Sequence, residues 1–501
     1  MSFPYIDELV NRAVEDYGGD FFSTPDRTLS VNDVSGDECQ FVWGEIAKTL
    51  YKADYAGTDY LGAPVLKQSG SRTVPQVPQN ETAGYQSVAP HSAGTTRDFD
   101  LTAIRGDFPI LSEKVNGKDL IWFDNGATTQ KPRQVIDRLK YFYEHENSNV
   151  HRGAHTLAAR STDAYEEARN IVAGFLGAPS ASEVIFVRGT TEGINLVAAA
   201  WGKDNLRSGD EILISYLEHH ANIVPWQLIA QETGAVIKVI PVDGNGDLQL
   251  EQYTNLLKSG NVKLVAVTQV ANSIGTVTPT EEITRLAHQF GARVLIDGAQ
   301  SVAHTATNVQ QTDADFFVFS GHKIFAPTGI GVLFGKQELL DSMRPYQGGG
   351  GMISDVTFEK SEYQPAPGKF EAGTGNIADA VGLGAALQYV SSIGIEAIRQ
   401  YEHRLLEYTR SEIASIDGIQ IVGNPVNRAG VVSFVHNRLA TEEINKALAA
   451  DGIALRAGHH CAQPILRKFG YESTVRASLA FYNTVEEVDI LVKKLKDLVK
   501  R

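Results

Sequence analysis

The sequence predicts an α/β fold with a mostly parallel sheet flanked by helices. Short runs of almost wholly apolar residues recur through the middle of the chain, and segments with helical periodicity lie between them. Strands that are buried on both faces have this composition. The apolar runs span residues 183–187, 211–215, 263–268, 293–297 and 316–320.

Helical patterns complete the alternation. Residues 280–290 place apolar side chains on one helical face between two of the apolar runs. Beyond about residue 385 the pattern changes, and it ends in a helical stretch over 485–499. We therefore expect a large domain and a smaller C-terminal α+β domain, with ligands at the carboxyl ends of the parallel strands.

Composition excludes several classes of protein. The chain has 501 residues, 43% of them hydrophobic and 21% charged, which argues against wholesale disorder and against a membrane bundle. A net charge of −15 without a basic patch disfavours a nucleic-acid partner. No apolar stretch approaches the ~18 residues of a membrane span and no leader pattern is visible, so we expect a cytoplasmic protein without a membrane partner. The two distant cysteines, Cys39 and Cys461, form neither a disulfide framework nor a zinc site.

The front of the chain differs from the rest. Residues 1–62 hold twelve acids and four bases, a net charge of −8, together with many aromatic residues. Short helices are expected there at most, over 5–17 and 38–54. Residues 63–98 are rich in Pro, Gly, Ser and Gln and predict a flexible linker. Because two short helices cannot enclose a core, we expect a mostly disordered N-terminal extension.

An acid and a lysine follow two of the apolar runs. Asp297 ends one predicted strand, and Lys323 comes just after the next one, in Ser-Gly-His-Lys. An Asp in this position can simply cap the following helix, and most lysines are solvated. Together at neighbouring strand ends, however, they are the parts that a pyridoxal phosphate site requires: a lysine that binds the cofactor and an acid that keeps its pyridine nitrogen protonated. No metal site is expected.

A phosphate site is predicted beside them. The turn that holds Thr190 and Thr191 leads from a predicted strand into a helix, whose N-terminal N–H groups bind anions. A threonine at such a place is ordinary by itself, but together with Ser320 and His322 near the lysine it predicts a phosphate pocket. Walker and Gly-x-Gly-x-x-Gly motifs are absent from the sequence, which disfavours nucleotide-based functions.

Cys461 lies in a polar loop after two histidines. Positive charge from Arg456 and these histidines favours the nucleophilic thiolate form. A buried, inert cysteine and a metal ligand are the alternatives, but adjacent residues rarely converge on one ion and no second cluster is visible. Shortly afterwards, Arg476 offers a planar fork suited to a substrate carboxylate.

Residues 99–501 resemble the SUF-type (group II) cysteine desulfurases, within the aminotransferase class V branch of fold-type I pyridoxal phosphate enzymes. Ordered motif matches carry the resemblance; they span residues 149–155, 188–195, 218–226, 297–300, 320–323, 370–374 and 456–461. The implied architecture is a segment 99–120 that joins the small domain, a large cofactor-binding domain over 121–384, and a small C-terminal domain over 385–501 with the catalytic cysteine loop.

The resemblance implies cofactor contacts for individual residues. Lys323 would hold the cofactor and move protons at the substrate Cα. Asp297 would pair with the pyridine nitrogen, and Gln300 with the phenolic oxygen. His219 would stack on the ring and act as acid or base, with His220 as the competing assignment. The phosphate would be held by Thr190, Thr191, Ser320 and His322, and by Thr374 from the other subunit of a homodimer.

The resemblance also implies a substrate site. Arg476 would bind the substrate carboxylate, and Arg456 the active-site loop or the substrate. Asn272 and His151 would line the same pocket. Cys461 would attack the sulfur of L-cysteine, take it as a persulfide and leave L-alanine, before a sulfur-acceptor protein receives it.

Other functions remain open at this stage. Selenocysteine lyases share the same motifs. An aminotransferase would not need Cys461, and a scaffold protein would need none of the catalytic residues. The extension 1–98 resembles the arms of cysteine desulfurases that are packaged inside encapsulin-type protein shells. An arm that binds a sulfur acceptor, inhibits the active site or only solubilises the enzyme would look the same.

Overall fold

The computed structural model describes residues 23–24, 27–28, 99–151 and 155–500. Within the first hundred residues, β1 (Ser23–Thr24) pairs with β2 (Arg27–Thr28) in an antiparallel ladder. Otherwise, the acidic extension with its expected helices, the linker over 63–98 and Cys39 lie outside the described residues.

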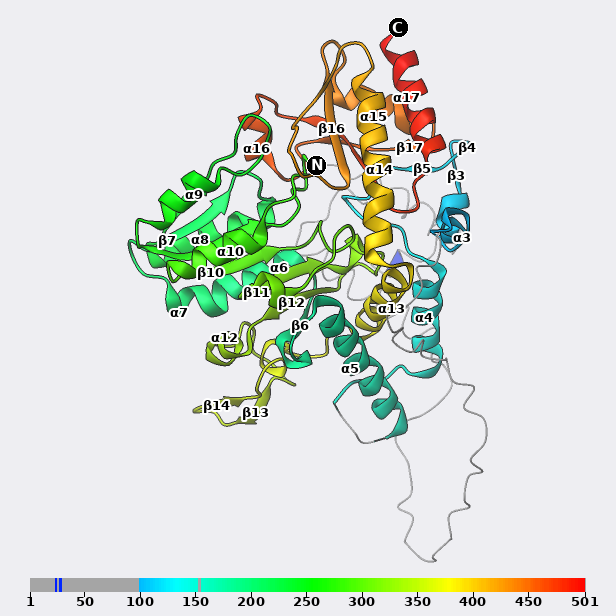
Figure 1. Cartoon of the computed structure of the whole chain (residues 1–501). Coiled ribbons are helices and arrows are strands. Elements are labelled where there is room, and N and C mark those ends of the chain that lie inside the picture. Colours follow the sequence, from blue (N-terminus) through cyan, green and yellow to red (C-terminus); the bar gives the residue numbers. More distant parts are fainter. Residues whose placement is uncertain (1–22, 25–26, 29–98, 152–154, 501) are drawn as a thin grey trace, which may run out of the picture. The chain divides into compact units, whose positions relative to one another are not determined.

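Seven strands form the central sheet, in the order β6-β12-β11-β10-β9-β7-β8 (Figure 1). Their bounds are β6 Val184–Val187, β7 Glu211–Ser215, β8 Val236–Ile240, β9 Val262–Thr268, β10 Arg293–Asp297, β11 Phe316–Ser320 and β12 Gly331–Gly335. β12 runs antiparallel to both of its neighbours, and all other neighbouring pairs are parallel. The prediction of a mostly parallel sheet is therefore confirmed, and each of the five apolar runs forms a strand.

Helices accompany this sheet. Their bounds are α3 Leu101–Gly106, α4 Arg133–His145, α5 Thr156–Leu176, α6 Thr190–Val197, α7 Lys203–Asn205, α8 Val224–Thr233, α9 Leu250–Leu257, α10 Thr280–Gln289, α11 Val309–Thr312, α12 Gln337–Ser342 and α13 Ile377–Ile393. α5 shows how the sequence sets such an element. Tyr165, Val172 and Leu176 fall on one buried face, and Gly177 ends the helix in a left-handed conformation with φ of 64°.

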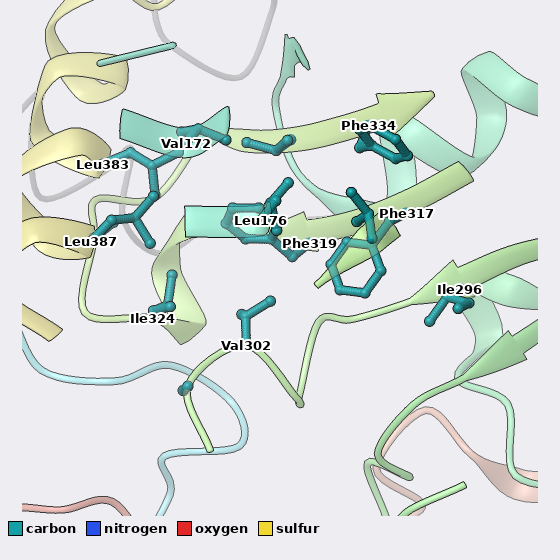
Figure 2. Close-up of a cluster of buried hydrophobic side chains, with 14 of the residues drawn as sticks. Val172, Leu176, Ile296, Val302, Phe317, Phe319, Ile324, Phe334, Leu383 and Leu387 are labelled. Carbon is teal, nitrogen blue, oxygen red and sulfur yellow. The ribbon is translucent and has the colours of Figure 1, made fainter. Parts of the chain in front are cut away.

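Both faces of the sheet are buried. In β11, Phe317 and Phe319 belong to one apolar cluster together with side chains of α5 and α13, part of which Figure 2 shows, while Phe316 and Val318 belong to a second cluster on the other face. Successive side chains of a strand point to opposite faces, so a strand between two helical layers must be apolar throughout. This is why the apolar runs were readable as strands.

The C-terminal part carries a separate four-stranded antiparallel sheet, in the order β15-β16-β19-β18. The strands are β15 Ile419–Ile421, β16 Val431–His436, β18 Arg456–Gly458 and β19 Thr474–Ser478, and the helices are α14 Ile395–Ala414, α15 Thr441–Ala450, α16 Gln463–Lys468 and α17 Val485–Val499. α17 coincides with the helix predicted over 485–499. The α+β character of this part is confirmed.

Short strand pairs complete the description. They are β3 Lys114–Val115 with β4 Lys118–Asp119, β5 Ile121–Trp122 with β17 Ile453–Ala454, and β13 Ile353–Val356 with β14 Ser361–Tyr363. Phe123 also packs into the core of the C-terminal sheet. Residues 121–123 thus contact the C-terminal part of the chain, and the domain boundaries stay a prediction.

Among the described helices, none alone has the length and apolar character needed to cross a membrane. α13 and α14, which meet at an angle of 75°, satisfy the length and composition requirement only as a bent pair.

Candidate active site

A cavity of about 190 Å³ opens where the strands of the central sheet end. β6, β9, β10 and β11 all bring their carboxyl ends to this edge. Most of the residues singled out from the sequence line it: Thr190, Thr191, His219, Asn272, Asp297, Gln300, Ser320, His322, Lys323, Arg456, Cys461 and Arg476. The structure therefore gathers residues from positions 190 to 476 around one space.

Two residues singled out from the sequence lie elsewhere. The His151 side chain is exposed, and its Nε2 lies 2.9 Å from Glu166 Oε1 on α5. His151 therefore does not line the cavity of its own chain, and its expected place in the substrate pocket stays a prediction. Thr374 lies in an exposed turn before α13 and does not line the cavity of its own chain either. Its role in a partner subunit stays a prediction.

Asp297 and Lys323 form the charged centre of the cavity. Asp297 is buried at the end of β10, where Oδ1 accepts a hydrogen bond from the Ala299 N–H at 2.9 Å. Burial raises the pKa of Asp297, against the opposing effects of that N–H and of Lys323. Burial also lowers the pKa of Lys323 to about 8, although Asp297 draws it upwards. A fraction of this amine is thus neutral near pH 7, as a nucleophile requires.

The N-terminus of α6 forms one end of the cavity. The Thr190 N–H donates to Ser320 Oγ at 2.8 Å, and the two hydroxyl oxygens lie 2.9 Å apart. The N-cap residue is Gly189, which has no side chain that could cover this end of the helix. Thr191 and His322 line the space beside it. Hydroxyl groups and helix N–H groups of this kind are donors for a phosphate group.

The two competing histidines, His219 and His220, differ in where they lie. His219 lines the cavity, whereas His220 does not, and the His220 ring lies 5.5 Å from the ring of His459. Burial, with Lys323 nearby, lowers the pKa of His219 to about 3. Its Nδ1 accepts a hydrogen bond from the Ala221 N–H at 3.1 Å, so the proton of the neutral ring sits on Nε2.

Hydrogen bonds fix the cysteine loop from both sides. His460 and Cys461 have φ values of 50° and 52°, a left-handed conformation that is uncommon for residues with a side chain. The carbonyl of Cys461 accepts from the His220 N–H at 2.8 Å, and that of His460 accepts from Asn272 Nδ2 at 2.7 Å. These bonds hold an energetically costly turn that keeps Cys461 in the cavity wall.

Sequence reasoning missed Asp124, which holds both arginines. Its Oδ1 lies 3.2 Å from Arg476 Nη2, and its Oδ2 lies 3.1 Å from Arg456 Nε. Arg476 is almost completely buried and also donates to the Asn272 carbonyl at 2.9 Å. The only signal in the sequence is a polar Asp-Asn-Gly stretch directly after the apolar residues 121–123.

Glu218 is a second residue that sequence reasoning did not assign, although it stands in a quoted motif. It is fully buried; Ser215 Oγ donates to one carboxylate oxygen, and Asn222 Nδ2 donates to the other at 2.6 Å. Burial raises the pKa of Glu218 to about 8. The carboxyl group therefore fixes the turn between β7 and α8 that carries His219.

This set of groups fits pyridoxal phosphate. A lysine amine, a buried carboxylate, a neutral histidine and a helix N-terminus lined by hydroxyls face one cavity. Gln300 also lines it, and its Nε2 donates to the carbonyl of Gly126 at 2.7 Å and to Asn272 Oδ1. Within the described residues, no group of three or more His, Cys, Asp or Glu side chains is arranged to hold a metal ion.

Comparisons with known proteins agree with this geometry. The family model for aminotransferase class V matches residues 121–491. Fold and site together define a pyridoxal phosphate-dependent enzyme of the α/β class. The chain is 60% identical to a cysteine desulfurase of Synechococcus elongatus over 84% of its own length and 67% of that protein. It is 48% identical to a cysteine desulfurase of an Enterobacter species, over 79% of this chain and 98% of the relative.

A solved structure is similar as well. The apo structure of a cysteine desulfurase from Thermococcus onnurineus NA1 superimposes with a TM-score of 0.76 at 38% identity, over 80% of this chain and 98% of that one. The chain belongs to the cysteine desulfurases of the aminotransferase class V family. It spans 67%, 66% and 58% of the length of three relatives at 60% identity, which are longer proteins.

Proposed function

We propose that this chain converts L-cysteine to L-alanine and receives the sulfur on Cys461 as a persulfide. The observation that carries the proposal is the meeting of Lys323, Asp297 and Cys461 in the wall of one cavity. A lysine and a buried acid alone would serve many pyridoxal phosphate reactions. The cysteine on a hydrogen-bonded loop adds the group that a desulfurase needs.

Each residue has a separate task. Arg476 binds the substrate carboxylate and thereby directs its sulfur towards Cys461. Lys323 is expected to bind the cofactor, and its Nζ takes the proton from the substrate Cα. The bound cofactor supplies an electron-accepting ring that makes this proton removable, and Asp297 keeps the pyridine nitrogen protonated. His219, which lines the cavity with Nε2–H as its donor, would stack on that ring and act as an acid.

Cys461 carries the sulfur transfer. Its Sγ, as thiolate, attacks the sulfur of the substrate, and a new S–S bond forms while the C–S bond breaks. The electron pair of the broken bond stays with the substrate carbon, which then takes a proton to give alanine. One cysteine and one thiol thus yield one alanine and one persulfide, without an external oxidant or reductant.

The test is incubation with L-cysteine and a reductant, followed by measurement of alanine and sulfide. Wild type should form both in equal amounts, and Cys461→Ala should form neither while it still binds the cofactor. Equal rates for the two proteins would refute the role of Cys461. Amino-group transfer to a keto acid by both proteins would favour an aminotransferase instead.

We also propose the roles that depend on partners. The enzyme acts as a homodimer of the SUF type, in which Thr374 completes the phosphate site of the other subunit, and it passes sulfur to an acceptor protein. Residues 1–98 bind the enzyme to a partner, and the partner that we favour is an encapsulin-type protein shell in the cytoplasm. The acidic, aromatic composition of residues 1–62 supports this. Deletion of 1–98 should leave turnover intact and abolish co-purification with a shell; loss of turnover would contradict it.

A further inference from the structure

A buried charged cluster lies at the start of the turn that contains Thr374. Its centre is Arg169 on α5, which is only 2% exposed. Arg169 Nη1 lies 2.7 Å from Glu371 Oε1, and Nη2 lies 2.9 Å from Glu371 Oε2. Arg169 Nε donates to Glu166 Oε2 at 3.0 Å. This two-bond Arg–carboxylate pairing fixes the orientation of Glu371 as well as its position.

Further donors fill the remaining sites on Glu371. The Phe186 N–H donates to Oε1 at 2.8 Å, and the Tyr165 hydroxyl donates to Oε2 at 3.0 Å. Each carboxylate oxygen therefore receives two hydrogen bonds: Oε1 receives one from α5 and one from β6, and Oε2 receives both from α5. A carboxylate held in this way has little rotational freedom, so the backbone at Glu371 is fixed against both elements.

The cluster joins three segments that contain predicted site residues. Glu371 begins the exposed turn with Thr374, and the Cβ position of Gly375 lies 3.6 Å from the Tyr165 hydroxyl. Phe186 belongs to β6, which leads to Thr190. Glu166, on the other side of Arg169, binds His151 at 2.9 Å. His151 and Thr374, the two predicted residues that do not line the cavity of their own chain, are thus both linked to this cluster, His151 by a hydrogen bond and Thr374 along the chain.

Stability alone is a poor explanation for this arrangement. A buried ion pair costs desolvation energy that its attraction does not always repay, so it is weak evidence for a stabilising role. A buried ion pair is better explained by a positioning role, in which it holds the segments that it joins in one conformation. The Thr374 turn is exposed, and its one apolar side chain, that of Ala372, is small, so its conformation depends mainly on polar contacts. The Gly373 N–H donates to the Gly350 carbonyl at 2.7 Å, and further contacts lie at the two ends of the turn. At the far end, Asn376 Nδ2 donates to the Gly329 carbonyl at 3.0 Å.

We propose that Arg169 and Glu371 are positioning residues that set the Thr374 turn for the phosphate site of a second copy of this chain. The inference rests on the proposed function, since it assumes that Thr374 contacts the cofactor phosphate across a dimer. Neither residue touches the cofactor. Their effect therefore passes through the geometry of the turn and should be visible as cofactor retention.

The experiment measures the rate of cofactor release from the holoenzyme after dilution, by visible absorbance, at a temperature far below unfolding. Glu371→Gln places an NH₂ group against donors of Arg169 or Tyr165 and should speed release at least tenfold. Thr374→Ala should speed release equally without lowering Tm. The double variant should be no faster than either single variant, because both act on one contact.

Asp315→Asn is the matched control. Asp315 is also fully buried and accepts hydrogen bonds from an arginine, Arg293, at 3.0 Å and from a strand N–H, that of Val294, at 2.8 Å. It precedes β11 and therefore lies at the sheet edge opposite the cavity. Asp315→Asn should lower Tm as Glu371→Gln does, with a wild-type release rate.

Two results would overturn the inference: wild-type release from Glu371→Gln, or equal acceleration by Asp315→Asn. If Glu371→Gln does not fold, Tyr165→Phe removes one of the four donors from a folded cluster and should still speed release; a wild-type rate for it and for Thr374→Ala refutes the proposal. A wild-type protein that never binds pyridoxal phosphate would instead refute the proposed function.

Discussion

Replacing Asp124 by Asn should weaken substrate binding, because one carboxylate holds both arginines of the site. The substitution keeps the shape of the side chain but replaces one oxygen by an NH₂ group, which faces a guanidinium donor. Burial lowers the pKa of Arg476 to about 10, and Asp124 is the group that opposes this most strongly. Without it, Arg476 loses its balancing charge and its orientation.

The magnitude follows from the burial of each arginine. The Arg456 side chain is 49% exposed, so its pair contributes about 0–1 kcal/mol. Arg476 is 1% exposed, and breaking a buried pair by removing one partner costs about 3–5 kcal/mol. Because Asn can still accept one hydrogen bond worth about 1 kcal/mol, the expected loss is about 2–4 kcal/mol. Expressed wholly in kcat/KM, this is roughly 30- to 1,000-fold.

The assay measures KM and kcat for L-cysteine from initial rates of alanine formation, together with the unfolding free energy in urea. Most of the loss should fall on KM, because Arg476 binds the substrate in the proposed mechanism. Glu396→Gln, which removes an exposed Glu396–Arg399 pair, is the control and should change neither quantity. An unchanged KM and an unchanged unfolding free energy for Asp124→Asn would refute the reasoning.

Three further predictions concern the groups around the cavity. Cofactor incorporation into the apoprotein should accelerate as pH rises towards about 8, the pKa of Lys323, because only the neutral amine reacts; a flat profile by absorbance would contradict this. Because the pKa of Glu218 is raised from 4.5 to about 8, the free energy of unfolding should be highest below pH 4.5 and should fall as pH rises through 8. Glu218→Gln should remove this fall in urea titrations at several pH values. An unchanged dependence of the unfolding free energy on pH would count against the prediction. Gly298→Ala would place a Cβ atom 2.1 Å from the buried ring of Phe317 and disturb the neighbouring Asp297. It should lower the unfolding free energy by about 1–3 kcal/mol, and a wild-type unfolding free energy would show that the ring can move.

Much of the site was readable from the sequence because it depends on local order. Asp297 ends a buried strand, Lys323 follows the next one, and Thr190 opens a helix after a third. The carboxyl ends of parallel strands meet at one edge, so residues at those ends come together whatever the loops do. Cys461 and Arg476, in the C-terminal part of the chain, were singled out from their neighbouring residues, and the resemblance then supplied their roles.

The sequence did not predict the order of the strands or the direction of each strand in the sheet. β12 is antiparallel and stands between β6 and β11, and β8 is an edge strand with exposed valines. Such placements are decided by which strand pairs with which, and a one-dimensional pattern does not contain pairing. For the same reason, local chemistry left His219 and His220 as competing assignments, and only the resemblance favoured His219.

The sequence by itself determined the alternation of strands and helices, the family and the order of the catalytic groups along the chain, because each depends on neighbouring residues. Only the tertiary structure decided which charges balance one another. Asp124 meets Arg476 across 352 positions, and Arg169 meets Glu371 across 202. A buried ion pair is set by distance and desolvation in three dimensions, and neither quantity is written in the spacing of residues.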